Sequence, residues 1–271
     1  MNIFVFGTLL SETFRKIVLG RELHSEHICT ASLKNFCVYW AEGGPFPVIV
    51  PQNGTEVHGI VLKDLNEHDI ERLNYYELGF GYVLKEALVE TNDCPQDVFA
   101  YFCKSSDMAS KNLWSFDDWL TKHSEIQYLA TTEFMDFFGT KFGDTAQRMY
   151  NSILKRAEIY VKERSSVRKA IEGGPSKHAK AQVESLSREY LGFFALNQIN
   201  LKYPYFSQTL PDTKKRVILM GSEASLILPY DPVNEKVLLI EQFRIGPFCR
   251  GDRAPWVCLL YTSPSPRDRV L

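Results

Sequence analysis

Glu77 is the residue of this sequence best suited to act as a general base. It is a lone carboxylate in Arg72–Tyr82, a segment rich in aromatic residues. Apolar surroundings raise the pKa of a carboxyl group, and such a group can accept a proton from a substrate. A carboxylate near a helix end is also often just a solvated side chain. The residue type alone leaves both interpretations open.

Two glycine-containing segments could bring a ligand close to the main chain. The apolar run Phe4–Phe6 leads into Gly7 and Thr8. A glycine at a strand end lets a ligand approach backbone N–H groups, which can bind a carboxylate or an oxyanion. Most such strand ends are only turns. The segment Gly43–Ile49, which reads Gly-Gly-Pro-Phe-Pro-Val-Ile, is predicted to form a second irregular loop.

Short strands around one helix would position these segments. Runs rich in β-branched and aromatic residues, bounded by Gly, Pro and Asn, predict strands at Asn2–Phe6, Ser32–Tyr39, Val57–Leu62, Tyr82–Glu90 and Val98–Cys103. Asn66 is a suitable N-cap for a helix that buries Ile70 and Leu73. That helix is expected to end near Gly79 and Gly81, where the backbone is free to turn.

In this order, the three segments resemble the γ-glutamylcyclotransferase-like (AIG2-like) family. That family has an N-terminal Tyr-Gly-Thr/Ser-Leu loop, a central Gly-x-Phe-Pro segment and a Leu-Asp-x-x-Glu-Gly segment. The resemblance covers residues 1–105 and implies an α+β fold, in which a small mixed β-barrel carries flanking helices.

The resemblance also implies an activity. Main-chain N–H groups of the glycine loop would hold the α-carboxylate of a small-molecule γ-glutamyl substrate. Glu77 would be the catalytic base for attack of the α-amine on the γ-carbonyl, which releases 5-oxoproline. The tethered nucleophile requires no metal or organic cofactor. The substrate-binding residues carried over are Phe6, Gly7, Thr8, Leu9 and Tyr82.

Two residues depart from the family pattern. Phe6 stands where the family has a tyrosine, and Asn74 replaces the aspartate of Leu-Asp-x-x-Glu. These departures favour an alternative in which the domain is a non-enzymatic binding module.

Residues 106–176 are predicted to be a helical linker. Met149, Ile153, Ala157 and Tyr160 recur at helical spacing, which predicts an amphipathic helix that packs against a neighbouring domain. The sequence Gly-Gly-Pro-Ser at 173–176 marks a break. A short helix is expected near Lys180–Ser187, and strands follow at Leu191–Ile199, Val217–Met220, Ala224–Leu228 and Val237–Phe243. Asp231–Glu235 predicts a hairpin turn.

Residues 177–257 resemble the N-terminal part of ADP-ribose pyrophosphatases of the Nudix superfamily. The matching stretches are Gly192–Leu196, Ala224–Pro232 and Val237–Arg244. The resemblance implies an incomplete Nudix α/β/α-type sheet. It assigns vestigial contacts to ADP-ribose, with Arg244 and Arg216 at the diphosphate and Phe194 or Phe193 at the adenine.

Hydrolysis in that superfamily uses carboxylates of the Nudix box to hold Mg²⁺. The box, Gly-x5-Glu-x7-Arg-Glu-x-x-Glu-Glu-x-Gly, does not occur in residues 1–271. Mg²⁺ is therefore expected only in a complete Nudix parent. An alternative follows, in which the natural protein is mainly an ADP-ribose diphosphatase with an N-terminal accessory module. The combination of these two domains in one chain resembles bacterial fusion proteins associated with tellurite resistance.

Residues 258–271 break the Nudix pattern. Cys258–Asp268 resembles a translated transposase adapter of sequencing libraries, and the segment is expected to be an artefact of that origin. A Pro/Ser-rich terminal tail is the alternative interpretation.

The composition excludes several classes of partner. A net charge of −2 provides no general attraction to nucleic acid or to an acidic membrane, and no apolar run approaches the roughly 18 residues of a membrane span. Six scattered cysteines without a Cys-x-x-Cys pair favour reduced thiols in the cytoplasm. The sequence leaves open whether the protein forms a homodimer.

Overall fold

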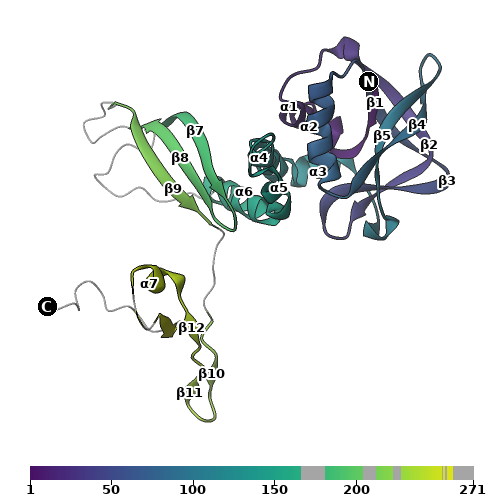
Figure 1. The fold of residues 1–271 in the computed structure, drawn as a ribbon. Coiled ribbons are helices and arrows are strands. Elements are labelled where there is room, and N and C mark those ends of the chain that lie inside the picture. The colour runs from purple at the N-terminus through teal and green to yellow at the C-terminus, as the bar shows by residue number, and fades with distance from the viewer. Residues whose placement is uncertain (166–180, 204–211, 222–226, 252, 254, 259–271) are drawn as a thin grey trace. The chain divides into compact units, whose positions relative to one another are not determined.

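The computed structural model describes residues 1–165, 181–203, 212–221, 227–251, 253 and 255–258 (Figure 1). The chain divides into two compact units, Met1–Ser222 and Glu223–Leu271, which are considered separately below.

A closed, mixed β-barrel forms the N-terminal part of the first unit. Its strands follow one another around the ring in the order β3-β1-β5-β4-β2, and pairing of β2 with β3 closes the ring. Strand β1 runs parallel to β5, and the other barrel pairs are antiparallel. The barrel strands are β1 (Ile3–Val5), β2 (Ile28–Ala41), β3 (Gly44–Leu62), β4 (Tyr82–Thr91) and β5 (Pro95–Cys103). The predicted α+β barrel is confirmed.

The two faces of the barrel strands are buried against different partners. Phe4 lies in a cluster with Val61 and Val98, to which the barrel strands alone contribute. Its neighbours Ile3 and Val5 belong to a second cluster, shared with the flanking helices. Successive side chains of a strand point to opposite faces. Both faces of β1 are covered, which is why all of its residues are apolar.

The expected loop at Gly43–Ile49 is a strand from its second residue onward. Strand β3 begins at Gly44, and Pro47 pairs with Trp40 of β2. The prediction of irregular structure was therefore wrong. Proline lacks a backbone donor and is tolerated near the start of a strand.

Helix α1 (Glu12–Leu19) and helix α2 (Glu67–Leu78) flank the barrel (Figure 1). The predicted N-cap of α2 is confirmed: the Asn66 side chain accepts a hydrogen bond from the Asp69 N–H at 2.9 Å. The Asp69 carboxylate accepts one from the Asn66 N–H at 3.0 Å, which completes a capping box. Gly81, with φ of 86°, follows the helix and turns the chain into β4.

The segment predicted as a helical linker packs into the same core as the barrel. It begins with strand β6 (Ala109–Leu113), which extends the sheet beside β2, and continues as helices. Trp119, Phe134 and Ile153 are each 0% exposed and share one cluster with Ile3 and Val5. The helices are α3 (Phe116–Lys122), α4 (Ser124–Met135), α5 (Gly143–Arg148) and α6 (Tyr150–Ser165).

Three antiparallel strands complete the described part of this unit: β7 (Gln182–Leu191), β8 (Ala195–Lys202) and β9 (Lys214–Met220). The helix expected near Lys180–Ser187 was wrong, because residues 182–187 pair with β8. The strand predicted at Leu191–Ile199 is interrupted by the turn at 192–194. Of the strand predicted at Ala224–Leu228, residues 224–226 lie outside the described residues, and Ile227 and Leu228 are not in a strand.

A group of buried charges joins β7 to the helices. The Arg156 Nε donates to Glu133 Oε1 at 3.0 Å, and both side chains are largely buried. Arg188 of β7 lies 3.7 Å from the same carboxylate and donates to Asp136 Oδ2 at 2.7 Å. One carboxylate of α4 thus contacts arginines of α6 and β7.

The second unit contains short elements. The predicted hairpin is confirmed, since Tyr230 and Asp231 of β10 pair with Val237 and Lys236 of β11. The predicted strand Val237–Phe243 is broken at 238–240. The remaining elements are β12 (Glu241–Phe243), α7 (Ile245–Cys249) and β13 (Trp256–Cys258). Of the expected adapter segment, residues 259–271 lie outside the described residues.

All six cysteines are free thiols. No helix within the described ranges is long and apolar enough to cross a membrane.

Candidate active site

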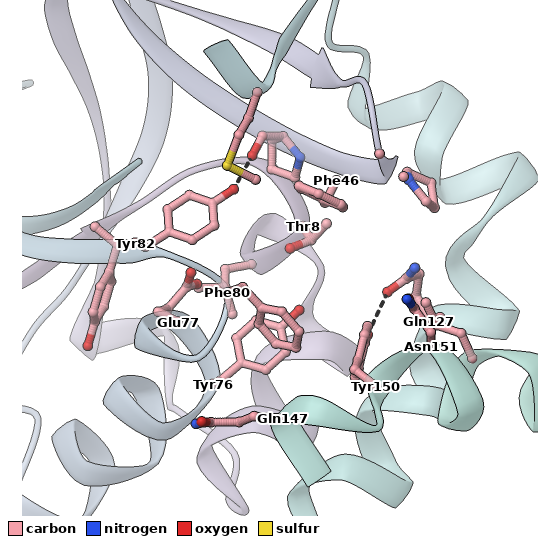
Figure 2. Close-up of a pocket in the computed structure, with 18 of the residues that line it drawn as sticks. Thr8, Phe46, Tyr76, Glu77, Phe80, Tyr82, Gln127, Gln147, Tyr150 and Asn151 are labelled. Carbon is pink, nitrogen blue, oxygen red and sulfur yellow. Dashed lines mark hydrogen bonds between the residues drawn. The ribbon is translucent and has the colours of Figure 1, made fainter. Parts of the chain in front are cut away.

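A pocket of about 660 Å³ lies between one side of the barrel and the helices that follow it (Figure 2). The chain segments that form it are the end of β1 with the following turn, the β2–β3 turn, the end of α2, strands β4 and β5, and helices α4 to α6. Segments from both ends of the first 160 residues therefore meet at one cavity.

Glu77 lies in the last turn of α2 and lines this pocket (Figure 2). Its side chain is only partly exposed, and burial raises the pKa of its carboxyl group to about 8. No hydrogen bond or ion pair to this carboxyl group is found within the described part of the chain. Glu77 is thus a pocket carboxyl group without a fixed partner, and it is mostly protonated at neutral pH.

Three tyrosines lie around Glu77. Burial first, and the nearby Glu77 carboxylate after it, raise the pKa values of Tyr82 and Tyr101. Tyr76 is affected by burial and by Tyr150 as well as Glu77. All these phenols are therefore neutral hydrogen-bond donors at neutral pH.

The structure brings the glycine loop, the proline segment and Tyr82 together. The Tyr82 hydroxyl donates to the Pro47 carbonyl at 2.5 Å. Gly7 has φ of 63°, and a Cβ built on it would lie 2.3 Å from Pro47 Cγ. The loop adopts this position against β3 only because residue 7 has no side chain.

The other loop residues face the cavity. Phe6, Thr8 and Leu9 are buried and line the pocket, whereas Gly7 is not a lining residue and packs against Pro47. Figure 2 shows Thr8 and Glu77 directed into the same space. The departure at Asn74 lies next to the site, because its Oδ1 accepts a hydrogen bond from the Tyr101 hydroxyl at 2.9 Å.

The sequence did not predict the contribution of α4 to α6. In Figure 2, Gln127, Tyr150 and Asn151 lie across the pocket from Glu77 and Tyr82, and the Tyr150 hydroxyl donates to Gln127 Oε1 at 3.2 Å. The full set from these helices is Gln127, Gln147, Arg148, Tyr150, Asn151, Leu154, Lys155 and Glu158. Their helical spacing was visible in the sequence, but a polar stripe opposite an apolar one is typical of a solvated face.

The residues assigned to ADP-ribose fall in different units. Arg216 and Phe194 belong to the first unit, where Arg216 Nη2 donates to the Tyr203 hydroxyl at 2.9 Å and Phe194 contacts Phe193 edge to face. Arg244 belongs to the second unit and precedes α7. Their role in ADP-ribose binding stays a prediction.

In the part of the chain that the structure describes, no three or more His, Cys, Asp or Glu residues are grouped so as to hold a metal ion. The described residues therefore do not offer the carboxylate cluster that holds Mg²⁺ in a Nudix hydrolase.

Comparison with known proteins identifies the class of the N-terminal domain. Residues 3–121 match the model of the family described as gamma-glutamyl cyclotransferase, AIG2-like. Together with the closed five-stranded barrel, this match supports an AIG2-like domain in this part of the chain.

Individual relatives fall into two groups. AIG2-like protein B of Arabidopsis thaliana is 29% identical over 138 residues, which cover 50% of this chain and 78% of that protein. ADP-ribose pyrophosphatase of Escherichia coli K12 is 34% identical over 85 residues, 31% of this chain. The chain spans 40% of the length of that enzyme, and a Nudix domain at 177–257 stays a prediction.

Solved structures that match part of the chain include a gamma-glutamyl cyclotransferase and a plant protein. The former has a TM-score of 0.31 and 22% identity, covering 38% of this chain and 66% of its own. The latter, from Arabidopsis thaliana, has a TM-score of 0.36 and 26% identity, covering 50% of this chain and 90% of its own.

Proposed function

We propose that the N-terminal domain is a cyclotransferase that releases 5-oxoproline from a γ-glutamyl compound, with Glu77 as the general base. The observation that carries the proposal is the unpartnered Glu77 carboxyl group, which shares a pocket with the Phe6–Leu9 turn. The family match over residues 3–121 supports the same reaction class.

The turn after β1 is the proposed site for the α-carboxylate of the glutamyl group. Gly7–Leu10 is a 3-10 turn, and the first N–H groups of such a turn have no acceptor within it. Backbone donors of this kind suit a carboxylate. With its α-carboxylate at Thr8 and Leu9, a glutamyl group lies in the same cavity as Glu77.

In the proposed reaction, Glu77 removes a proton from the α-amine, whose nitrogen attacks the γ-carbonyl carbon. A bond forms between these two atoms and closes the five-membered ring. The bond from that carbon to the leaving nitrogen breaks, and the proton on Glu77 passes to the leaving amine. Attack within one molecule gains from proximity, and the base needs a pKa near the working pH.

The test is release of 5-oxoproline from γ-glutamyl dipeptides by the purified chain as a function of pH. Proton abstraction requires ionised Glu77, and its pKa is raised to about 8 by burial. We therefore expect kcat/KM to rise with pH up to about 8 and to level off above it.

Absence of 5-oxoproline at every pH would contradict the proposal. If γ-glutamyl compounds then still protected the chain from thermal unfolding, the domain would be the binding module that the departures Phe6 and Asn74 favour.

A second candidate, ADP-ribose pyrophosphatase activity, is favoured by the 34% identity over 85 residues with the Escherichia coli enzyme. Residues 1–271 lack the Nudix box, so we expect this chain to release no AMP from ADP-ribose with Mg²⁺. Metal-dependent AMP release by residues 1–271, measured by chromatography, would contradict this expectation.

A further inference from the structure

The wall of the pocket opposite Glu77 carries a polar stripe. Arg148 ends α5, and Asn151, Lys155 and Glu158 follow on α6 at intervals of three or four residues. On α6 this spacing places Asn151, Lys155 and Glu158 on one side of the helix, and they line the same pocket as Arg148 at the end of α5. All four are exposed, so the stripe forms the outer rim of the cavity.

The charges of the stripe are not equivalent. The Lys155 Nζ donates to Glu158 Oε2 at 2.8 Å, so these two charges largely compensate each other. Arg148 has only a long hydrogen bond, 3.4 Å, from Nη2 to Thr145 Oγ1. Among the described residues it has no ion pair. Arg148 is therefore the uncompensated cation at the rim.

The position of this cation relative to the proposed chemistry determines what it can reach. In the proposed reaction, the glutamyl group occupies the side of the pocket formed by Thr8, Leu9 and Glu77. The part of the substrate beyond the γ-carbonyl must extend away from that side. The facing wall is formed by Gln127, Tyr150 and Asn151 (Figure 2). Arg148, at the end of α5 and two positions before Tyr150, lines the same pocket. The leaving portion of the substrate thus lies against α4 to α6.

We propose that Arg148 binds a carboxylate on the leaving portion, and that the preferred substrates are γ-glutamyl amino acids or peptides rather than γ-glutamyl derivatives of simple amines. A guanidinium group binds a carboxylate through paired hydrogen bonds. The specificity lies in residues 127–158, beyond the 3–121 matched by the family model. This inference rests on the proposed function.

The test compares two substrates that differ only by the carboxylate, γ-glutamyl-alanine and γ-glutamyl-ethylamine, with the full chain. Because the rim is exposed to solvent, we expect a preference for γ-glutamyl-alanine of about three- to tenfold in kcat/KM, through KM. Arg148→Gln is expected to abolish the preference by acting on γ-glutamyl-alanine alone. Arg148→Lys is expected to restore part of it. Added salt is expected to reduce it, because exposed charges are screened.

Arg164→Gln is the matched control. Arg164 is an exposed arginine of the neighbouring helix α6, paired with Glu125 at 3.3 Å, and is not among the residues that line the pocket. Its replacement is expected to leave the preference unchanged.

Two results would overturn the inference: an equal loss for both substrates in Arg148→Gln, or no preference in the wild-type chain. An equal loss would place Arg148 at the glutamyl group itself. If neither substrate released 5-oxoproline, the proposed function would fail instead. The same pair would then be compared by protection from thermal unfolding, where the inference still requires stronger protection by γ-glutamyl-alanine that Arg148→Gln removes.

Discussion

Glu77→Gln is expected to lower kcat for 5-oxoproline release by about 10²–10⁴-fold, the usual contribution of a positioned general base. Glutamine has nearly the same shape and keeps hydrogen-bonding capacity, but it cannot accept the proton. The pocket has few other means to replace it, because the tyrosines around Glu77 are neutral phenols at neutral pH. KM is expected to change little, since the proposed binding groups lie in the Phe6–Leu9 turn.

Steady-state kinetics of 5-oxoproline release would measure the effect. Glu71→Gln, an exposed carboxylate of the same helix, is the matched control and should leave kcat unchanged. Equal kcat values for wild type and Glu77→Gln would remove Glu77 from the mechanism.

The same variant reports on the pKa of Glu77 through stability. Burial raises that pKa from the model-peptide value of 4.5 to about 8, so the folded chain binds more protons than the unfolded chain between these values. The free energy of unfolding of the wild type should therefore fall, relative to the variant, by up to about 1.4 kcal/mol per pH unit as the pH rises through this window. Denaturant titrations at several pH values would show whether the two chains diverge, and parallel curves would mean that Glu77 has an ordinary pKa.

Gly7→Ala is expected to lower the free energy of unfolding by about 2–4 kcal/mol, from the combined costs of left-handed backbone and of overpacking. The added Cβ would lie 2.3 Å from Pro47 Cγ and 2.9 Å from Pro47 Cβ. Pro47 has little freedom to move, because its carbonyl accepts the hydrogen bond from Tyr82 and its ring is part of β3. Either the turn or the start of β3 must shift.

Gly54→Ala separates the two costs. Gly54 also has positive φ, 78°, but no atom lies within 4 Å of the Cβ that alanine would add. We expect it to lose only about 1–2 kcal/mol, the cost of the left-handed backbone for a residue with a Cβ. Chemical denaturation of both variants measures the difference, and an equal loss would show that Pro47 does not confine the loop.

The barrel was predictable because its signals are local. Strands near β1, β2 and β5 follow from β-branched and aromatic runs, and the start of α2 follows from Asn66, whose cap involves residues only three positions apart. The Gly44–Ile49 segment was wrongly predicted to be a loop, because its glycine and prolines suggest a turn. There, pairing with β2 outweighs local preference.

Only part of the pocket was predictable, because only some of its residues belong to local sequence motifs. Glu77, the Phe6–Leu9 turn and Tyr82 belong to motifs, whereas Gln127, Arg148 and Asn151 belong to a helical stretch whose partner surface the sequence does not specify. The apolar positions Ile153 and Ala157 predicted that the helix packs. Which surface it packs against, and so which polar residues reach the cavity, depends on contacts distant in sequence.

The position of β1 in the ring has a consequence for how the domain forms during synthesis. Strand β1 is made before the rest of the domain, yet its two neighbours are residues 60–62 of β3 and residues 99–100 of β5. Both of its sides thus stay without ladder partners until most of the domain has been made. Closing the ring requires distant segments to meet, which costs chain entropy and slows folding. The apolar strand Ile3–Val5 therefore depends on late partners, and it is the segment of this domain that a nascent chain must keep from associating with others.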